Sequence, residues 1–258
     1  MPVSRGLYYF ANEGDNYARP PIVLIHGAGG HHLYWPPQVR RLQGQRMFAL
    51  DLPGHGKSSG TGHQTIEGYA TDVARFIQSL GLSTAVLLGH SMGGAIALEM
   101  ASRDPKRVLG LGLLATGARL PVAPEILRAS ADPARFFEAV ALLEELSFAP
   151  QTSLRLRKSA ADRLRETRPA VLHGDVLACD AFDITPRLAD IAVPTVILCG
   201  AEDRMTPPRY SAFLQARIGG ASLDILPNAG HMVMLEQPDE VAAQIEMFVN
   251  SIQYRPGA

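Results

Sequence analysis

Residues 89–93 read Gly-His-Ser-Met-Gly and fit the pattern G-x-S-x-G. In this pattern a serine stands on a sharp turn from a strand into a helix, and the flanking glycines relieve crowding around it. The apolar run 85–88 precedes the motif, and a helical pattern follows it from about Gly94. A glycine-rich helix start is the alternative interpretation, but a strand before and a helix after favour a nucleophile. We therefore predict that Ser91 attacks an electrophilic carbon.

A serine hydroxyl is a poor nucleophile until a histidine accepts its proton, and an acid must orient that histidine. Serine, acid and histidine in this chain order form one known arrangement. Asp203 follows the apolar run 195–199, and His231, the one histidine after Asp203, follows the run 223–226. Glu202 is the rival acid, but adjacent side chains point in different directions. We predict Asp203 and His231 as the partners of Ser91.

A tetrahedral intermediate also needs backbone donors for its oxyanion. The helix that starts after Ser91 would supply the N–H of Met92. A second donor is expected from the glycine-rich loop 26–30, which follows the apolar run 22–25. We predict the N–H of Ala28 for this role, with that of Gly29 as the alternative.

Two other glycine-rich stretches each differ from a known nucleotide-binding motif at one required residue. Residues 27–32 have a histidine where a dinucleotide-binding loop needs its third glycine, and residues 51–58 have Asp51 where a P-loop needs its first. Four histidines could suggest a metal site: His26, His31, His32 and His55. Adjacent histidines rarely bind one ion, and no carboxylate stands at matching spacing. We expect neither a cofactor nor a metal.

The elements around these motifs alternate between strand and helix. Continuous apolar runs predict buried parallel strands at 22–25, 47–50, 85–88, 109–114 and 195–199. Residues 7–10 predict an antiparallel edge strand, and helical patterns cover 71–80 and 95–103. We predict an α/β fold with a mostly parallel, doubly wound sheet. Strand-like runs stop between 117 and 192, which predicts a helical insertion between two parts of one core, 1–116 and 193–258.

The bulk composition excludes several partners. The chain has 258 residues, 24 basic and 25 acidic side chains, and a net charge of −1, so nothing indicates a nucleic-acid or anionic-membrane partner. We find no apolar run of membrane-spanning length and no signal-peptide pattern. Two cysteines are too few for a disulfide framework. A cytoplasmic protein is expected, and its oligomeric state cannot be read.

Taken together, residues 26–27, 51–58, 89–94 and 228–231 with Asp203 resemble the α/β-hydrolase fold superfamily, and small carboxylesterases and enol-lactonase-like hydrolases in particular. The resemblance implies the α/β-hydrolase fold, the triad and the oxyanion donors named above. It also implies that 117–192 form a cap that largely sets the substrate.

A small-molecule ester is the substrate that this resemblance implies. The alternatives are lactone or C–C bond hydrolysis, cofactor-free perhydrolysis or cyanohydrin cleavage by the same triad, and a non-catalytic binding protein on the same fold. An apolar pocket is expected between core and cap. Its predicted lining is Gly29, Leu33, Trp35, His90, Phe136 and Leu143. Five arginines of the insertion, Arg155, Arg157, Arg163, Arg165 and Arg168, are expected on solvated helix faces.

Overall fold

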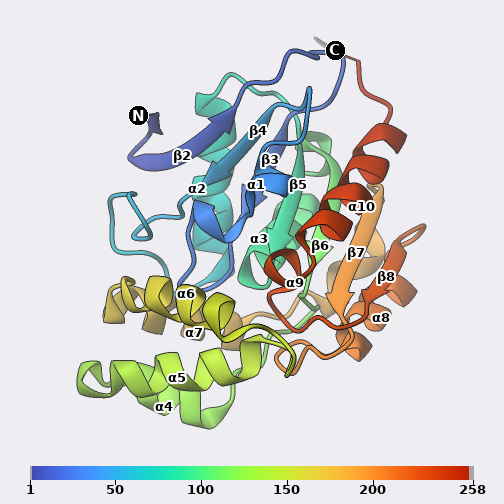
Figure 1. The fold of residues 1–258 in the computed structure, drawn as a ribbon. Coiled ribbons are helices and arrows are strands. Elements are labelled where there is room, and N and C mark those ends of the chain that lie inside the picture. The colour runs from blue at the N-terminus through green and yellow to red at the C-terminus, as the bar shows by residue number, and fades with distance from the viewer. Residues whose placement is uncertain (1, 256–258) are drawn as a thin grey trace.

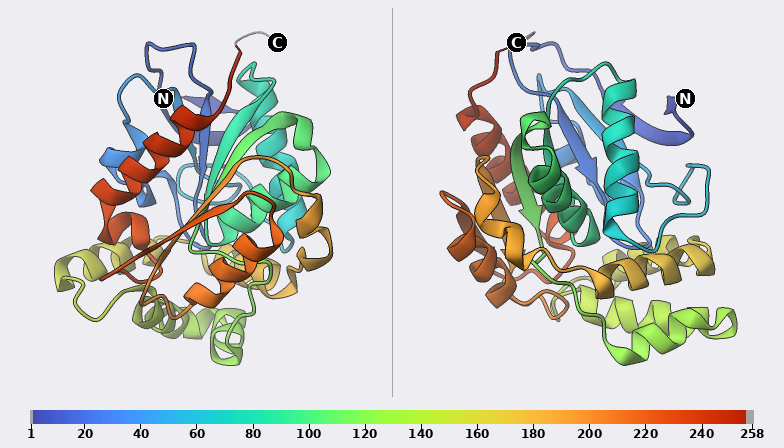
Figure 2. Two further views of the ribbon diagram at one scale, coloured as in Figure 1. Left: turned by 90° about the vertical axis from the view of Figure 1, so that its right-hand side faces the viewer. Right: turned by 180° about the vertical axis from the view of Figure 1, so that it is seen from behind.

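The computed structural model describes residues 2–255, which form one eight-stranded sheet with helices on both faces (Figures 1 and 2). The strands lie in the order β1-β2-β4-β3-β5-β6-β7-β8. β1 and β2 are antiparallel to their neighbours, and the other strands run parallel. The bounds are β1 Val3–Ser4, β2 Leu7–Asn12, β3 Ile22–Ile25, β4 Met47–Leu50, β5 Ala85–His90, β6 Val108–Leu114, β7 Thr195–Gly200 and β8 Ser222–Leu226.

The predicted strands are confirmed, with one correction at the edge of the sheet. β2 is antiparallel, as expected for residues 7–10, but the two-residue strand β1 pairs with its outer side. β2 is therefore not the outermost strand. β3, β5 and β7 are buried along their whole length because helices cover both faces of the sheet, which explains their continuous apolar sequences.

The helices divide between the two faces of the sheet and its carboxyl edge. Their bounds are α1 Pro37–Arg40, α2 Ile66–Ser79, α3 Met92–Arg103, α4 Pro124–Ala131, α5 Phe136–Ser147, α6 Leu154–Arg165, α7 Pro169–Ala181, α8 Pro208–Arg217, α9 Val233–Glu236 and α10 Pro238–Ser251. Short 3-10 helices lie at His32–Tyr34, Pro105–Arg107, Pro133–Arg135 and Thr185–Asp190. α2 begins five residues earlier than predicted because the Thr65 hydroxyl accepts a 3.2 Å hydrogen bond from the Gly68 N–H and caps the helix.

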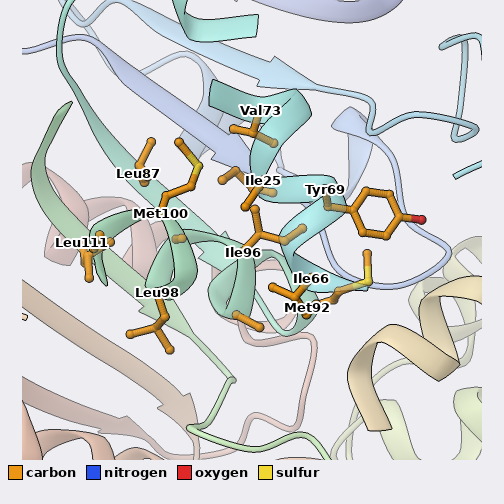
Figure 3. Packing of buried hydrophobic residues seen from close by; sticks show 14 of the residues in the cluster. Ile25, Ile66, Tyr69, Val73, Leu87, Met92, Ile96, Leu98, Met100 and Leu111 are labelled. Carbon is orange, nitrogen blue, oxygen red and sulfur yellow. The ribbon is translucent and has the colours of Figure 1, made fainter. Parts of the chain in front are cut away.

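Two apolar clusters sandwich the sheet. On one face α2, α3 and α8 pack against strand residues such as Ile25, Leu87 and Leu111, and Figure 3 shows part of this cluster. On the other face α1, α9 and α10 pack against Leu24 and Leu88. Successive residues of a strand thus face opposite clusters, as the period of two requires. The strands are held from both sides, so their carboxyl ends form a rigid edge.

Helices α4–α7 lie together across that edge, in the stretch between β6 and β7 (Figure 1). We call these four helices and the loops between them the cap. The cap has a small apolar centre of its own around Phe136, Val140, Leu164 and Leu172. Two of its arginines also contact the rest of the chain, because Arg163 donates to the Leu33 carbonyl and Arg168 to the carbonyls of Gly54 and Gly60. These two arginines are not merely solvated, in contrast to the expectation for this group.

Candidate active site

Ser91 is the single residue between the end of β5 and the start of α3, and its backbone conformation is rare for residues other than glycine. Its φ is 52° and its ψ −118°, a geometry that costs of order 1–3 kcal/mol. The surroundings hold it there: the Ser91 N–H donates to the Leu114 carbonyl at 2.9 Å, and the Thr116 hydroxyl donates to the Ser91 carbonyl at 2.8 Å. A side chain at Gly93 would collide with the Ile25 carbonyl, which explains the second glycine of the motif.

Asp203 and His231 form a buried pair on neighbouring loops, after β7 and β8. His231 Nδ1 lies 2.9 Å from Asp203 Oδ2. Thr206 donates to both carboxylate oxygens, from its N–H and its hydroxyl, and the Met205 N–H donates as well, each at 2.8 Å. Burial alone would raise the pKa of the Asp203 carboxyl, but His231 and the two hydrogen bonds from Thr206 outweigh it and lower that pKa. Since Nδ1 faces an ionised carboxylate, it carries the proton, and Nε2 of the neutral ring is free to accept one.

Ser91 and His231 line the same cavity, which has a volume of about 170 Å³. Within residues 2–255, no hydrogen bond joins the Ser91 hydroxyl to the His231 ring. Such contacts often tighten only when substrate is bound. The arrangement places a hydroxyl on a strained backbone, an imidazole and a buried carboxylate at one edge of the sheet. Nucleophilic acyl transfer needs these three groups.

Of the two predicted positions for the second oxyanion donor, Gly29 is already engaged. Its N–H donates to the carboxylate of Asp175, a cap residue, at 2.8 Å. Ala28 lines the cavity beside Ser91. Met92 begins α3 directly after Ser91, so its N–H is one of those at a helix start without an intrahelical acceptor. Ala28 and Met92 are therefore the better candidates for the two donors.

The cavity lies between the cap and the carboxyl edge of the sheet and is mostly apolar. Its lining is Ala28, Ser91, Leu120, Pro121, Val122, Ala123, Ile126, Leu143, Leu146, Val176, Cys179, Arg204, Met205, Thr206 and His231. Arg204 is its one formally charged side chain, and it is turned toward the backbone carbonyl of Glu145. Small, uncharged groups suit such a lining.

Leu143 is the one residue of the predicted pocket set that lines this cavity. Trp35 is fully buried in the cluster beside α1, and Phe136 belongs to the apolar centre of the cap. Neither side chain lines the cavity, because an aromatic residue of a loop or helix can fill a core position as well as a pocket wall. Gly29 and Leu33 also lie outside the lining, and their backbones contact Asp175 and Arg163 of the cap instead.

His90 does not line the cavity either, and it holds the loop that carries His231. Its Nε2 donates to the His231 carbonyl at 2.9 Å. Burial, and then the nearby His231, lower the pKa of His90 to about 3, so the ring stays neutral. His90 thus acts on His231 through the backbone.

Sequence reasoning missed two polar residues of this region. Thr206 lies three residues after Asp203. Loops that begin with Asp typically have N–H groups two and three residues later that donate to its carboxylate, so the contact of Thr206 with Asp203 could have been predicted. Asp175 had no such signal, since its partners are more than 100 residues away. Glu202, the rival acid, is not bonded to His231 and accepts a hydrogen bond from Gln151 at 2.8 Å.

Two of the four histidines that could suggest a metal site, His31 and His32, lie next to a carboxylate in space, although none stands at matching spacing in the sequence. One ligand-type atom from each of His31, His32 and Asp51 lies within 4.8 Å of the others. The carboxylate oxygens of Asp51 already accept hydrogen bonds from the N–H and Nδ1 of His32 and from the Lys57 N–H. The donors are thus used to tie two loops together, and this arrangement does not favour a metal.

A larger cavity, of about 460 Å³, lies next to the first and shares Pro121 with it. Its other lining residues are Ala118, Arg119, Thr185, Arg209, Tyr210 and Phe213. It contains none of Ser91, Asp203 and His231. The candidate active-site cavity is therefore identified by the side chains that line it, Ser91 and His231, and not by its volume.

A sequence model described as the alpha/beta hydrolase family matches residues 22–244. The chain belongs to this family. The match begins with β3 and ends within α10, so it includes Ser91, Asp203 and His231 as well as the cap. The fold predicted from the sequence is thereby confirmed.

Individual members of the family point to ester chemistry. The chain is 31% identical over 245 residues to the pimeloyl-[acyl-carrier protein] methyl ester esterase of Neisseria meningitidis serogroup C, covering 90% of this chain and 94% of that protein. It resembles the solved structure of a thermophilic esterase, with 32% identity, a TM-score of 0.80 and coverage of 95% and 98%. It also resembles the enol-lactonase from Burkholderia xenovorans LB400, with 27% identity, a TM-score of 0.85 and coverage of 95% and 96%.

Among the helices of residues 2–255, none combines the length and the apolar character that a membrane span requires.

Proposed function

We propose that the protein is a serine hydrolase that cleaves carboxylic esters of small to medium size through an acyl-enzyme. The observation that carries this proposal is the buried 2.9 Å hydrogen bond from His231 to Asp203, together with the cavity that His231 shares with Ser91. The esterases among its relatives support the same chemistry.

In the first half of the reaction, His231 Nε2 takes the proton of the Ser91 hydroxyl as that oxygen attacks the ester carbonyl. The oxyanion that forms accepts hydrogen bonds from the N–H groups of Met92 and Ala28. His231 then gives its proton to the leaving alcohol, and the acyl group remains on Ser91.

In the second half, water replaces the alcohol. His231 takes a proton from the water, the hydroxide attacks the acyl carbon, and collapse of the intermediate returns the proton to Ser91 and releases the acid. Asp203 stays ionised throughout and stabilises the imidazolium that forms twice in the cycle. Every atom is accounted for by ester and water, so the cycle needs no cofactor.

The apolar group of the substrate occupies the cavity under the cap. Leu143 and Leu146 of α5, Val176 of α7 and Ile126 of α4 form the part of its apolar wall that the cap helices supply, together with Ala123 and Cys179 close by. We also propose that the chain divides functionally into a core, residues 1–116 and 193–258, that carries the reaction, and a cap, residues 117–192, that selects the substrate.

Hydrolysis of p-nitrophenyl butyrate by the wild type and by Ser91→Ala tests the proposal. We expect the wild type to release p-nitrophenol and the variant, folded by circular dichroism, to release none above background. Equal rates would exclude Ser91 as the nucleophile.

Lactone hydrolysis is the second candidate, favoured by the likeness to the solved enol-lactonase. A lactone is a cyclic ester, so the same groups would open it, with the leaving alcohol still attached to the acyl group. Comparing kcat/KM for γ- and δ-lactones with that for linear esters of equal carbon number separates the two. A higher value for the lactones would favour this second function.

A further inference from the structure

One carboxylate of the cap is buried in the core. Asp175 of α7 is fully buried, and its carboxylate accepts three hydrogen bonds from three separate segments of the chain. The Gly29 N–H donates to it at 2.8 Å, His55 Nε2 at 2.7 Å and the Tyr69 hydroxyl at 2.5 Å. The residue that follows a proposed oxyanion donor is thus bonded directly to the cap.

His55 brings a positive charge to this carboxylate. Its Nδ1 lies 3.0 Å from the Pro53 carbonyl and its Nε2 faces Asp175, so both ring nitrogens face acceptors. Both can donate only when the ring is an imidazolium. Burial lowers the pKa of His55, but the charge of Asp175 and its hydrogen bond outweigh burial and raise that pKa above its ordinary value. A buried ion pair therefore joins α7 to the loop after β4.

The hydrogen bond from the Gly29 N–H to Asp175 also shapes the loop that holds the proposed oxyanion donor. Gly29 has a positive φ of 62° and is bonded to the cap on both sides: its N–H to Asp175, and its carbonyl to the Thr167 hydroxyl at 2.7 Å. The same turn lets the Gly30 N–H donate to the Gly27 carbonyl at 3.0 Å. That carbonyl belongs to the peptide unit of the Ala28 N–H, and the two groups of a trans peptide point in opposite directions. Holding Gly29 therefore fixes where the Ala28 N–H points.

We propose that Asp175 is a positioning residue, which holds the Gly29 N–H from the cap and so aims the Ala28 N–H at the oxyanion. This inference rests on the proposed ester hydrolysis. It gives the hydrogen bond between Asp175 and the Gly29 N–H a part in catalysis, so that α7 does more than select the substrate. Because the Ala28 N–H is needed most when negative charge develops, the effect of Asp175 falls on the transition state.

The variants Asp175→Ala and Asp175→Asn test this role. Asp175→Ala removes every acceptor from the Gly29 N–H, and we expect kcat to fall roughly 30-fold, part of the 100- to 1000-fold loss that follows deletion of a whole donor. KM should change far less. Asp175→Asn keeps one oxygen for the Gly29 N–H and His55 Nε2, which both donate to Oδ2 in the wild type, but a neutral amide is a weaker acceptor than a carboxylate, and we expect a loss of roughly 5-fold.

Arg168→Met is the matched control. Arg168 precedes α7 and also ties the cap to the core, through the carbonyls of Gly54 and Gly60, but among the described residues it forms no hydrogen bond with residues 27–30. We expect it to leave kcat unchanged. If Arg168→Met and Asp175→Ala lower kcat equally, loose docking of the cap is the cause, and the proposal is wrong.

A trifluoromethyl ketone provides a readout that a purely structural role would not move. It forms an oxyanion on the nucleophile, whereas the product acid binds without one. We expect the inhibition constant of the ketone to rise in parallel with the loss of kcat/KM in both Asp175 variants, and that of the product acid to stay constant. Wild-type kcat and wild-type ketone affinity in folded Asp175→Asn or Asp175→Ala would overturn the proposal. Activity remaining in Ser91→Ala would instead overturn the ester hydrolysis itself, so the two failures are distinguishable.

Discussion

Asp203 Oδ2 accepts a 2.9 Å hydrogen bond from His231 Nδ1 and a 2.8 Å hydrogen bond from the Thr206 hydroxyl. Both donors favour the ionised carboxylate, which keeps the proton of the neutral ring on Nδ1. The direction of proton transfer at His231 therefore follows from the surroundings of Asp203.

Replacing this carboxylate by an amide should disable the histidine. Asp203→Asn presents an N–H group or a weaker acceptor to Nδ1, which favours the wrong tautomer, and we expect kcat to fall about 10⁴-fold. The measurement is kcat for a p-nitrophenyl ester at neutral pH. Glu202→Gln is the control, since Glu202 contacts Gln151 and not His231. Loss of activity in the control with retention in Asp203→Asn would reverse the assignment of the acid.

The glycine after Met92 should not tolerate a side chain. In Gly93→Ala the new methyl group collides with the Ile25 carbonyl of β3, and neither backbone can move because both are buried. We expect a loss of about 3 kcal/mol or more in the free energy of unfolding, measured by urea denaturation. Gly219→Ala, where a methyl group meets no atom within 4 Å, should unfold like the wild type. A Gly93→Ala protein as stable as this control contradicts the packing described for the turn.

Enlarging the cavity should change the preferred acyl chain. Leu143→Ala opens the apolar wall, and each further methylene that becomes buried is worth about 0.8 kcal/mol, or about fourfold in kcat/KM. The test is kcat/KM over p-nitrophenyl esters of increasing acyl length, with an expected shift toward longer chains. Phe137→Ala alters another residue of α5, which is 66% exposed and does not line the cavity, and should leave the profile in place. The same shift in both variants would mean that the acyl group lies elsewhere.

The pair formed by His55 and Asp175 should give stability a defined dependence on pH. The folded pKa of His55 is raised above the unfolded value of about 6.5, so its contribution is complete below that pH and is lost as the pH rises through the folded pKa. The other groups that face or act on His55 include His26, His31, Asp51 and Tyr69. His26 works in the opposite sense, because burial, and then His55, keep its pKa well below the ordinary value.

Comparison with His55→Gln isolates this contribution. The difference in unfolding free energy between wild type and variant, from urea titrations between about pH 5.5 and 9, should be largest at the acid end and shrink as the pH rises. A difference that is constant, or that grows with pH, is inconsistent with a protonated His55.

The sequence was sufficient for those parts of the molecule that local rules control. Buried parallel strands are continuous apolar runs, so β3 to β7 could be recognised, and the turn at Ser91 has its own glycine pattern. Asp203 and His231 could be placed because the carboxyl ends of parallel strands share one edge. Contacts between distant segments have no such pattern. Asp175 finds Gly29, 146 residues away, only after the cap has folded over the sheet.

The wall of the cavity was the least predictable part. Trp35 was expected there because it follows the glycine-rich loop 26–30, and Phe136 because it lies in the insertion, but both fill apolar clusters. The side chains that do form the wall, such as Leu120 and Val176, are ordinary apolar residues that reach the cavity only because of how the chain between β6 and β7 packs on the core. Helical periodicity alone does not distinguish the two kinds of position.

The central claim is that Ser91 is the nucleophile, and covalent labelling tests it most directly. The wild type is incubated with a fluorophosphonate, digested, and the peptides are analysed by mass spectrometry. The account predicts one adduct, on Ser91, which is absent from Ser91→Ala and forms more slowly in His231→Ala. An adduct on another residue, or labelling of Ser91→Ala at the wild-type rate, would contradict it.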